Sequence, residues 1–103
     1  MNKNKIIKEI EKRRMNLKSK GVKKIGLFGS YLKGTQKRGS DIDFLVTFEK
    51  ENIGENYFKV LFYLEDLFKR KIDLIAVQTL RKELNYVKKE AVYVKINGNW
   101  NNE

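Results

Sequence analysis

The chain has 103 residues, a formal net charge of +10 at pH 7, and neither cysteine nor histidine. The missing residue types exclude disulfides, thiolate or imidazole metal ligands, and nucleophilic catalysis by Ser-His or Cys-His pairs. Carboxylates, lysines, hydroxyls and backbone groups remain. Together they suit phosphoryl transfer supported by a divalent metal ion.

The length predicts a single domain over 1–103, with its core at about 8–93. No apolar run approaches the roughly 20 residues that span a bilayer, and no signal-type apolar segment follows the first residues, so we expect a cytoplasmic protein without a membrane partner. The positive charge is dispersed along the chain. It fits nucleic acid, an acidic protein or a nucleoside triphosphate as the binding partner.

The first part of the chain predicts a helix followed by a strand. Apolar residues recur at helical spacing over 3–19, and Gly21 follows as a stop signal. The basic face of this helix is either solvated or contacts RNA or a partner, and solvation is favoured. Residues 22–28 lack the polar alternation of an exposed edge, which predicts a strand inside the sheet.

A short helix is predicted over 30–34, with the Ser30 side chain as its cap. A basic connection over 33–40 follows, whose cations lie either near a bound triphosphate or in an ordinary solvated loop. The apolar run over 41–47 predicts a second, central strand.

The second half predicts a helix, a strand and another helix. Asn52 and Glu55 resemble a capping box, and the helix that follows carries a wide core-facing stripe of Tyr57, Val60, Leu61, Leu64, Leu67 and Phe68. Residues 72–77 predict a third strand, and the spacing over 79–90 predicts a further helix. Residues 92–96 alternate like a short strand, and Trp100 packs on the domain or on a partner.

Two carboxylates open the second strand. Asp41 and Asp43 are two apart, so in a strand their side chains project to the same face. Adjacent carboxylates repel each other unless a proton or cation offsets the charge, and Mg²⁺ prefers oxygen ligands together with substrate phosphates. Gly29 and Ser30, at the end of the first strand, can approach a phosphate with backbone N–H groups and a hydroxyl. Taken alone, each feature is also typical of a solvated turn.

Asp73 lies within the apolar third strand, where an ionised carboxylate is costly unless something positive faces it. If this strand pairs with the second one, Asp73 completes a three-carboxylate cluster with Asp41 and Asp43. Pairing of Asp73 with Lys71 or Arg70 is the alternative.

Gly29-Ser30, ten intervening residues and Asp41-Ile42-Asp43 resemble the signature of the DNA polymerase β-type nucleotidyltransferases. The short form of the motif is similar to the minimal nucleotidyltransferase (MNT) branch, the antitoxins of HEPN/MNT toxin–antitoxin systems. Asp73 and the order of the elements fit the same family. The resemblance implies an α/β (α+β) fold, with a small mixed sheet and helices mainly on one face.

The resemblance further implies an antitoxin of a type VII system. Such a protein is an adenylyltransferase that moves AMP from ATP to a tyrosine of a HEPN ribonuclease toxin, with release of pyrophosphate. It implies that Asp41, Asp43 and Asp73 are the catalytic residues and hold two Mg²⁺ ions, while Gly29, Ser30 and Lys33 bind ATP. Lys33 stands where the family often carries arginine, so it keeps the charge without the bidentate geometry.

Three other functions are compatible with parts of this sequence. The chain could be a non-catalytic antitoxin that blocks its toxin sterically, or a nucleotidyltransferase that binds nucleic acid, as the charge of +10 suggests. Nucleic acid is not favoured. A small-molecule nucleotidyltransferase is disfavoured because no second domain is present to form an acceptor pocket.

Overall fold

The computed structural model describes residues 1–96. Four strands form one mixed sheet in the order β3-β2-β1-β4. Their bounds are β1 Val22–Phe28, β2 Ile42–Phe48, β3 Ile72–Ala76 and β4 Val92–Lys95. Strand β1 pairs antiparallel with both β2 and β4, whereas β2 and β3 are parallel. The predicted central position of the first two strands and the pairing of the second with the third are therefore confirmed.

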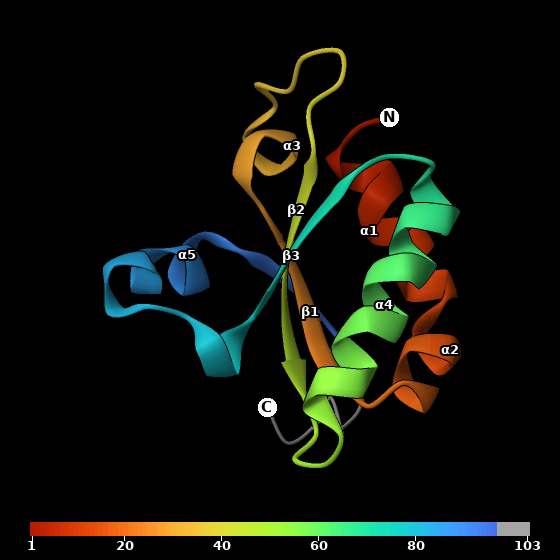
Figure 1. Ribbon diagram of the computed structural model, residues 1–103. Helices are drawn as coiled ribbons and strands as arrows, with labels where there is room; N and C mark the ends of the chain where they lie inside the picture. Colours follow the sequence, from red (N-terminus) through yellow and green to blue (C-terminus); the bar gives the residue numbers. More distant parts are fainter. Residues whose placement is uncertain (97–103) are drawn as a thin grey trace.

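Three helices cover one face of the sheet, namely α1 Lys3–Lys12, α2 Arg14–Ser19 and α4 Ile53–Phe68 (Figure 1). Helix α4 also forms the crossover connection that the parallel strands β2 and β3 require. The other face carries α5 Asn85–Glu90 and the 3₁₀ turns η1 Val77–Thr79 and η2 Lys82–Leu84. Helix α3, Gly29–Lys33, lies at one end of the sheet. None of the helices in the described part of the chain has the length and apolar character needed to cross a membrane.

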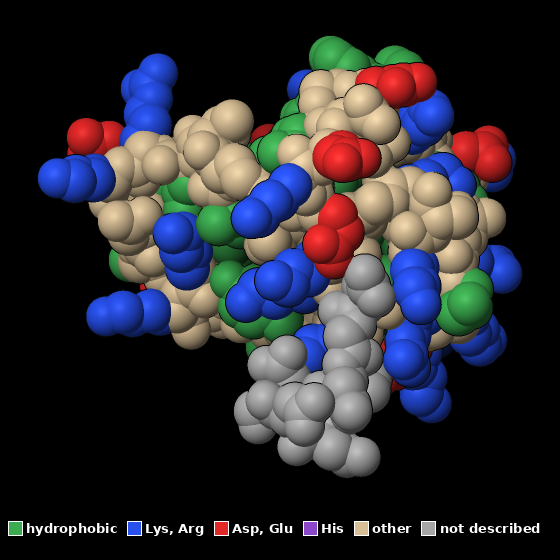
Figure 2. All heavy atoms as spheres, turned by 90° about the horizontal axis from the view of Figure 1, so that it is seen from below, with side chains coloured by type: hydrophobic (Ala, Val, Ile, Leu, Met, Phe, Trp, Pro, Cys, Tyr) green, Lys and Arg blue, Asp and Glu red, His purple; other side chains and the backbone are tan. Residues whose placement is uncertain are grey.

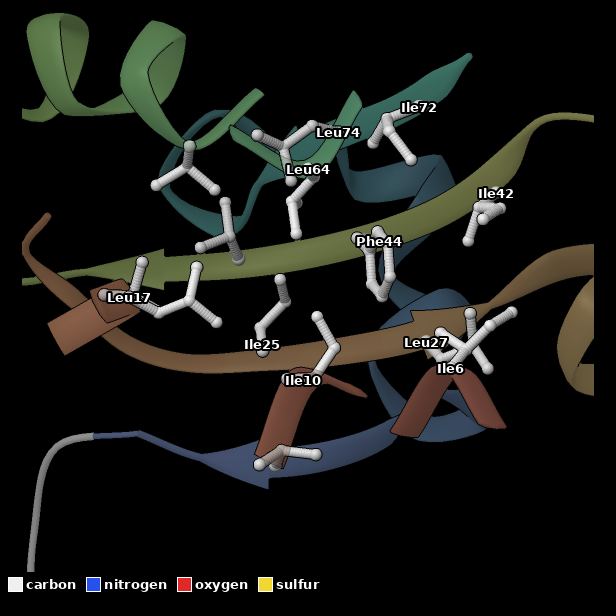
Figure 3. Packing of buried hydrophobic residues seen from close by; sticks show 14 of the residues in the cluster. Ile6, Ile10, Leu17, Ile25, Leu27, Ile42, Phe44, Leu64, Ile72 and Leu74 are labelled. Atoms are coloured by element: carbon white, nitrogen blue, oxygen red, sulfur yellow. The ribbon is translucent and has the colours of Figure 1, made fainter. Parts of the chain in front are cut away.

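The main core lies between the sheet and the three helices. Ile6 and Ile10 of α1 and Leu64 of α4 pack against apolar residues of β1, β2 and β3, including Phe44 and Leu74 (Figure 3). On β2, Phe44 and Val46 face this cluster, while Leu45 packs on the other face with Val87 and Ala91. Strand β2 is thus buried on both sides, which explains its continuous apolar run.

The prediction of one continuous helix over 3–19 is wrong, because the segment forms two helices. Arg13 separates α1 from α2, and its φ and ψ of −96° and 14° leave the helical region. Asn2 starts α1 by accepting a hydrogen bond from the Lys5 N–H at 3.0 Å. The break lets Leu17 of α2 reach the core, where it is fully buried.

Two predicted caps are also wrong. Asn52 adopts a left-handed conformation (φ 58°), and its side chain makes no capping hydrogen bond. Glu55 forms an ion pair with Lys59 instead. Helix α3 begins at Gly29, one residue earlier than predicted, so Ser30 lies inside it and does not cap it.

The predicted helix over 79–90 is reduced to α5 and the turns before it, because Leu80 and Leu84 reach the second apolar cluster from an extended and a 3₁₀ segment. The short strand predicted over 92–96 is confirmed as β4. Trp100 lies outside the described residues.

Candidate active site

Asp43 of β2 and Asp73 of β3 are register partners in the parallel strand pair. Neighbouring strands lie about 4.8 Å apart, so their side chains meet on the same face of the sheet. The two carboxyl groups form a hydrogen bond, in which the protonated one donates to the other. The predicted meeting of these two carboxylates is confirmed.

Burial and negative neighbours together raise the pKa of Asp43 to about 6. Burial contributes most, followed by the hydrogen bond and charge of Asp73 and then the charge of Asp41. The Ser30 N–H acts in the opposite direction, because it donates to the ionised carboxylate of Asp43. A site with this much unfavourable negative charge fits a divalent cation, which would replace the shared proton.

Asp41 directly precedes β2 and lies close enough to act on Asp43 through its charge. Within residues 1–96, however, no three Asp or Glu side chains are close enough together to hold one metal ion as a group. The structure therefore brings Asp43 and Asp73 together and leaves Asp41 beside that pair, because Asp41 precedes the strand and has no register partner on β3. The predicted cluster of three carboxylates around one metal ion is wrong in this respect. No ion pair joins Asp73 to Lys71 or Arg70 among the contacts of the described chain.

The turn that carries Gly29 and Ser30 lies against this carboxylate pair. Phe28, the last residue of β1, is the register partner of Asp43, so α3 starts directly beside it. Gly29 has a φ of +74°, and a Cβ atom on it would overlap Asp43 Oδ2 and lie 2.8 Å from Asp43 Cγ. Only glycine fits here, for reasons of both backbone conformation and space.

Lys33 is the last residue of α3, and its Nζ lies 3.9 Å from Glu90 Oε2 of α5. Both side chains are exposed, so the pair contributes little to stability. Among the described contacts, none links Lys33 to the three aspartates. Its predicted role at a phosphate thus finds no direct support in the geometry.

Tyr57 is a site neighbour that the sequence indicated only as a core residue. Its hydroxyl donates to the carbonyl of Leu74 in β3 at 2.6 Å, one residue from Asp73. Burial, and then the charge of Asp73, raise the pKa of Tyr57. In the sequence, the feature of Tyr57 that could have indicated a place near the site is its position close to the start of α4, at the border of the apolar stripe.

Comparison with known proteins agrees with this geometry. A family model described as a nucleotidyltransferase domain matches residues 4–96. The protein adenylyltransferase MntA of Thermococcus cleftensis is 39% identical over 75 residues, which cover 72% of this chain and 76% of the relative. A candidate protein adenylyltransferase of Methanocaldococcus jannaschii is 42% identical over 87 residues, covering 81% and 85%.

Solved structures share the fold. A candidate minimal nucleotidyltransferase aligns with a TM-score of 0.69 and 26% identity, covering 89% of this chain and 95% of the other. A toxin–antitoxin complex with AMP-PNP aligns with a TM-score of 0.66 and 25% identity, and the alignment covers 99% of this chain and 77% of the other. A complex of an MNT antitoxin with a tri-AMPylated HEPN toxin of Shewanella oneidensis aligns with a TM-score of 0.60. Because the sequence identity is 18%, this likeness shows the fold alone. The chain belongs to the nucleotidyltransferase domain family and, within it, to the protein adenylyltransferases related to MntA.

Proposed function

We propose that this adenylyltransferase is the antitoxin of a HEPN/MNT toxin–antitoxin system and acts in the cytoplasm. Its reaction transfers AMP from ATP to a tyrosine of the cognate HEPN toxin. Support comes from the relative named as a protein adenylyltransferase and from the 25% identical toxin–antitoxin structure with AMP-PNP. The HEPN partner and the tyrosine acceptor follow from the resemblance of the Gly-Ser and Asp-x-Asp motif.

One observation carries the catalytic assignment. Asp43 and Asp73 oppose each other across two parallel strands, beside the turn at Gly29 and Ser30. In the proposal Asp41 and Asp43 hold Mg²⁺ at the triphosphate, and Asp73 completes a site for a second ion. Magnesium would neutralise the charge of the phosphates and of the departing pyrophosphate.

The other steps of AMP transfer depend on residues of the chain itself. The tyrosine oxygen attacks the α-phosphorus, its proton passes to Asp73, and the bond to the β-phosphate breaks, which releases pyrophosphate. Gly29 lets the turn approach the terminal phosphates, and the Ser30 hydroxyl, which makes no capping hydrogen bond, donates to them. The exposed Lys33, four residues after Gly29 at the other end of α3, supplies positive charge to the triphosphate.

The test compares ATP labelled at the α-phosphate with ATP labelled at the γ-phosphate. Purified protein, Mg²⁺ and the HEPN protein encoded beside it should give labelled toxin with the α-label only. Asp43→Asn and Asp73→Asn should abolish transfer. Asp66→Asn is the matched control, because Asp66 is exposed on α4 and, within residues 1–96, forms an ion pair with Lys69 alone. Transfer of the γ-label, or full transfer by Asp43→Asn, contradicts the proposal.

A steric antitoxin is the second candidate, and one observation favours it. The described residues contain no group of three carboxylates close enough to hold a metal. On this alternative Asp43→Asn would still neutralise the toxin in cells and in ribonuclease assays. On the enzymatic proposal the variant binds the toxin but leaves its ribonuclease active.

A further inference from the structure

A groove lies between α1 and the C-terminal end of α4, on the helical side of the molecule. Its volume is about 470 Å³, and the residues that matter for its chemistry are Lys5, Lys8, Glu9, Lys12, Leu67 and Phe68. Helix α1 provides one wall and the last turn of α4 the other (Figure 1). Asp43 and Asp73 lie on the opposite side of the sheet from the apolar cluster that α1 covers, so an occupant here would leave the candidate active site open.

Lysines form a row along the α1 wall. Lys5, Lys8 and Lys12 follow each other at intervals of three and four residues, so they share one face of the helix. Lys12 pairs with Glu9 at 3.5 Å, whereas Lys5 and Lys8 are exposed and make no ion pair within the described residues. Two unneutralised cations thus stand at successive turns along one side of the groove.

The floor of the groove is apolar and packed against the main core. Phe68 is 3% exposed and packs against Phe44 of β2, with ring centroids 5.9 Å apart. Leu67 beside it is partly buried against the main core. Leu67 thus offers the exposed apolar surface of the floor, and an apolar side chain buried against it would add to the attraction of the lysine row.

We propose that this groove binds an acidic amphipathic helix of a partner protein. A helix with carboxylates at intervals of three and four residues matches the lysine row, and a leucine or similar side chain on its adjoining face fills the floor. Glu9 in the same wall pairs with both Lys12 and Arg13 at 3.5 Å, so the unpaired cations of the wall, within the described residues, are two discrete charges and not the continuous basic strip that favours RNA. Discrete carboxylates can be placed opposite Lys5 and Lys8 alone.

Lys and Arg side chains are also spread over other surfaces, including the face in Figure 2, so the test needs a control of equal charge. The probe is a fluorescent helical peptide of about 18 residues with Glu at the matching positions and Leu on the adjoining face. A poly-glutamate peptide and a single-stranded RNA of similar length are the comparison probes. The variants are the double change K5E/K8E and the control K18E/K23E, which alters exposed lysines of α2 and β1.

Peptide binding measured by anisotropy should weaken about tenfold or more in K5E/K8E and change little in K18E/K23E. It should exceed poly-glutamate binding, and amide shifts in NMR spectra should map to α1 and the end of α4. Equal weakening by both double variants, or shifts elsewhere, would overturn the proposal. RNA binding lost in K5E/K8E, with no peptide binding, would assign the groove to nucleic acid instead. Label transfer to the toxin is measured separately, so failure here is distinct from failure of the proposed function.

Discussion

Gly29 lies directly against the carboxyl group of Asp43, with no space for a side chain between them. The glycine that opens α3, directly after β1, thereby leaves room for a carboxylate of β2. We expect Gly29→Ala to displace Asp43 and abolish AMP transfer. Gly34→Ala is the matched control, because Gly34 has nearly the same φ (+76°) but nothing within 4 Å of an added Cβ.

Both alanine variants impose the cost of a left-handed residue, about 1 kcal/mol in the free energy of unfolding. Only Gly29→Ala also meets a neighbouring carboxylate. Thermal unfolding and label transfer separate the two effects. Similar activities for the two variants would show that contact with Asp43 does not matter for the reaction.

The raised pKa of Asp43 predicts how stability varies with pH when metal is chelated. The folded-state pKa of about 6 exceeds the ordinary value of 3.8, so this carboxyl favours folding below about pH 4, and the contribution is lost as the pH rises past 6. At pH 7 Asp43→Asn should therefore be more stable than the wild type. Because the group is partly exposed, we expect a gain of only about 1 kcal/mol.

Urea unfolding in EDTA between pH 4 and pH 7 measures this difference. The advantage of Asp43→Asn should appear as the pH rises and be absent near pH 4. Asp66→Asn should follow the wild type throughout, since its carboxyl is exposed. A constant difference between Asp43→Asn and the wild type at all pH values would contradict the assigned cause.

Mg²⁺ should reverse this order of stability. A cation that binds the folded carboxylate pair stabilises the wild type in proportion to its occupancy. The melting temperature of the wild type should rise with Mg²⁺ concentration at pH 7, and it should rise less in Asp43→Asn and Asp73→Asn. Equal rises in all three proteins would place the metal elsewhere.

The meeting of Asp43 and Asp73 was predictable because it depends on short-range sequence patterns. Two apolar runs defined strands, and the carboxylates at Asp43 and Asp73 stood out within them. Their pairing could be anticipated because 16 residues of helix α4 join the two strands, as a parallel pair requires. The contact of Gly29 with Asp43 was not predictable, since it depends on the antiparallel register of β1 with β2.

The errors have a common physical origin in tertiary context. Asn52 carries a favourable capping side chain, but the chain enters α4 through a left-handed turn at that residue, so the side chain cannot reach the first N–H groups. Leu80 and Leu84 have helical spacing, yet they bury themselves from extended and 3₁₀ segments against the second cluster. Local propensity was overridden in both segments.

Tyr57 should support Asp73 through the backbone of β3. Tyr57→Phe removes the hydrogen bond to the Leu74 carbonyl, and we expect a loss of about 1 kcal/mol in the free energy of unfolding together with slower AMP transfer. Tyr63→Phe is the control, because Tyr63 lies on the same helix and contacts Lys20 through its ring. If both variants transfer AMP at the same rate, Tyr57 has only a structural role.

Lys69 offers a stabilising change far from the site. It ends α4 in the left-handed conformation (φ 54°), which glycine adopts without the steric cost that a Cβ imposes. Lys69→Gly also removes an ion pair with Asp66, but both partners are exposed and the pair is worth little. We therefore expect Lys69→Gly to raise the free energy of unfolding by about 1 kcal/mol. Lys69→Ala loses the same ion pair while keeping the strained conformation, so it should be no more stable than the wild type, and equal stability of the alanine and glycine variants in urea unfolding would show that the conformation carries no cost.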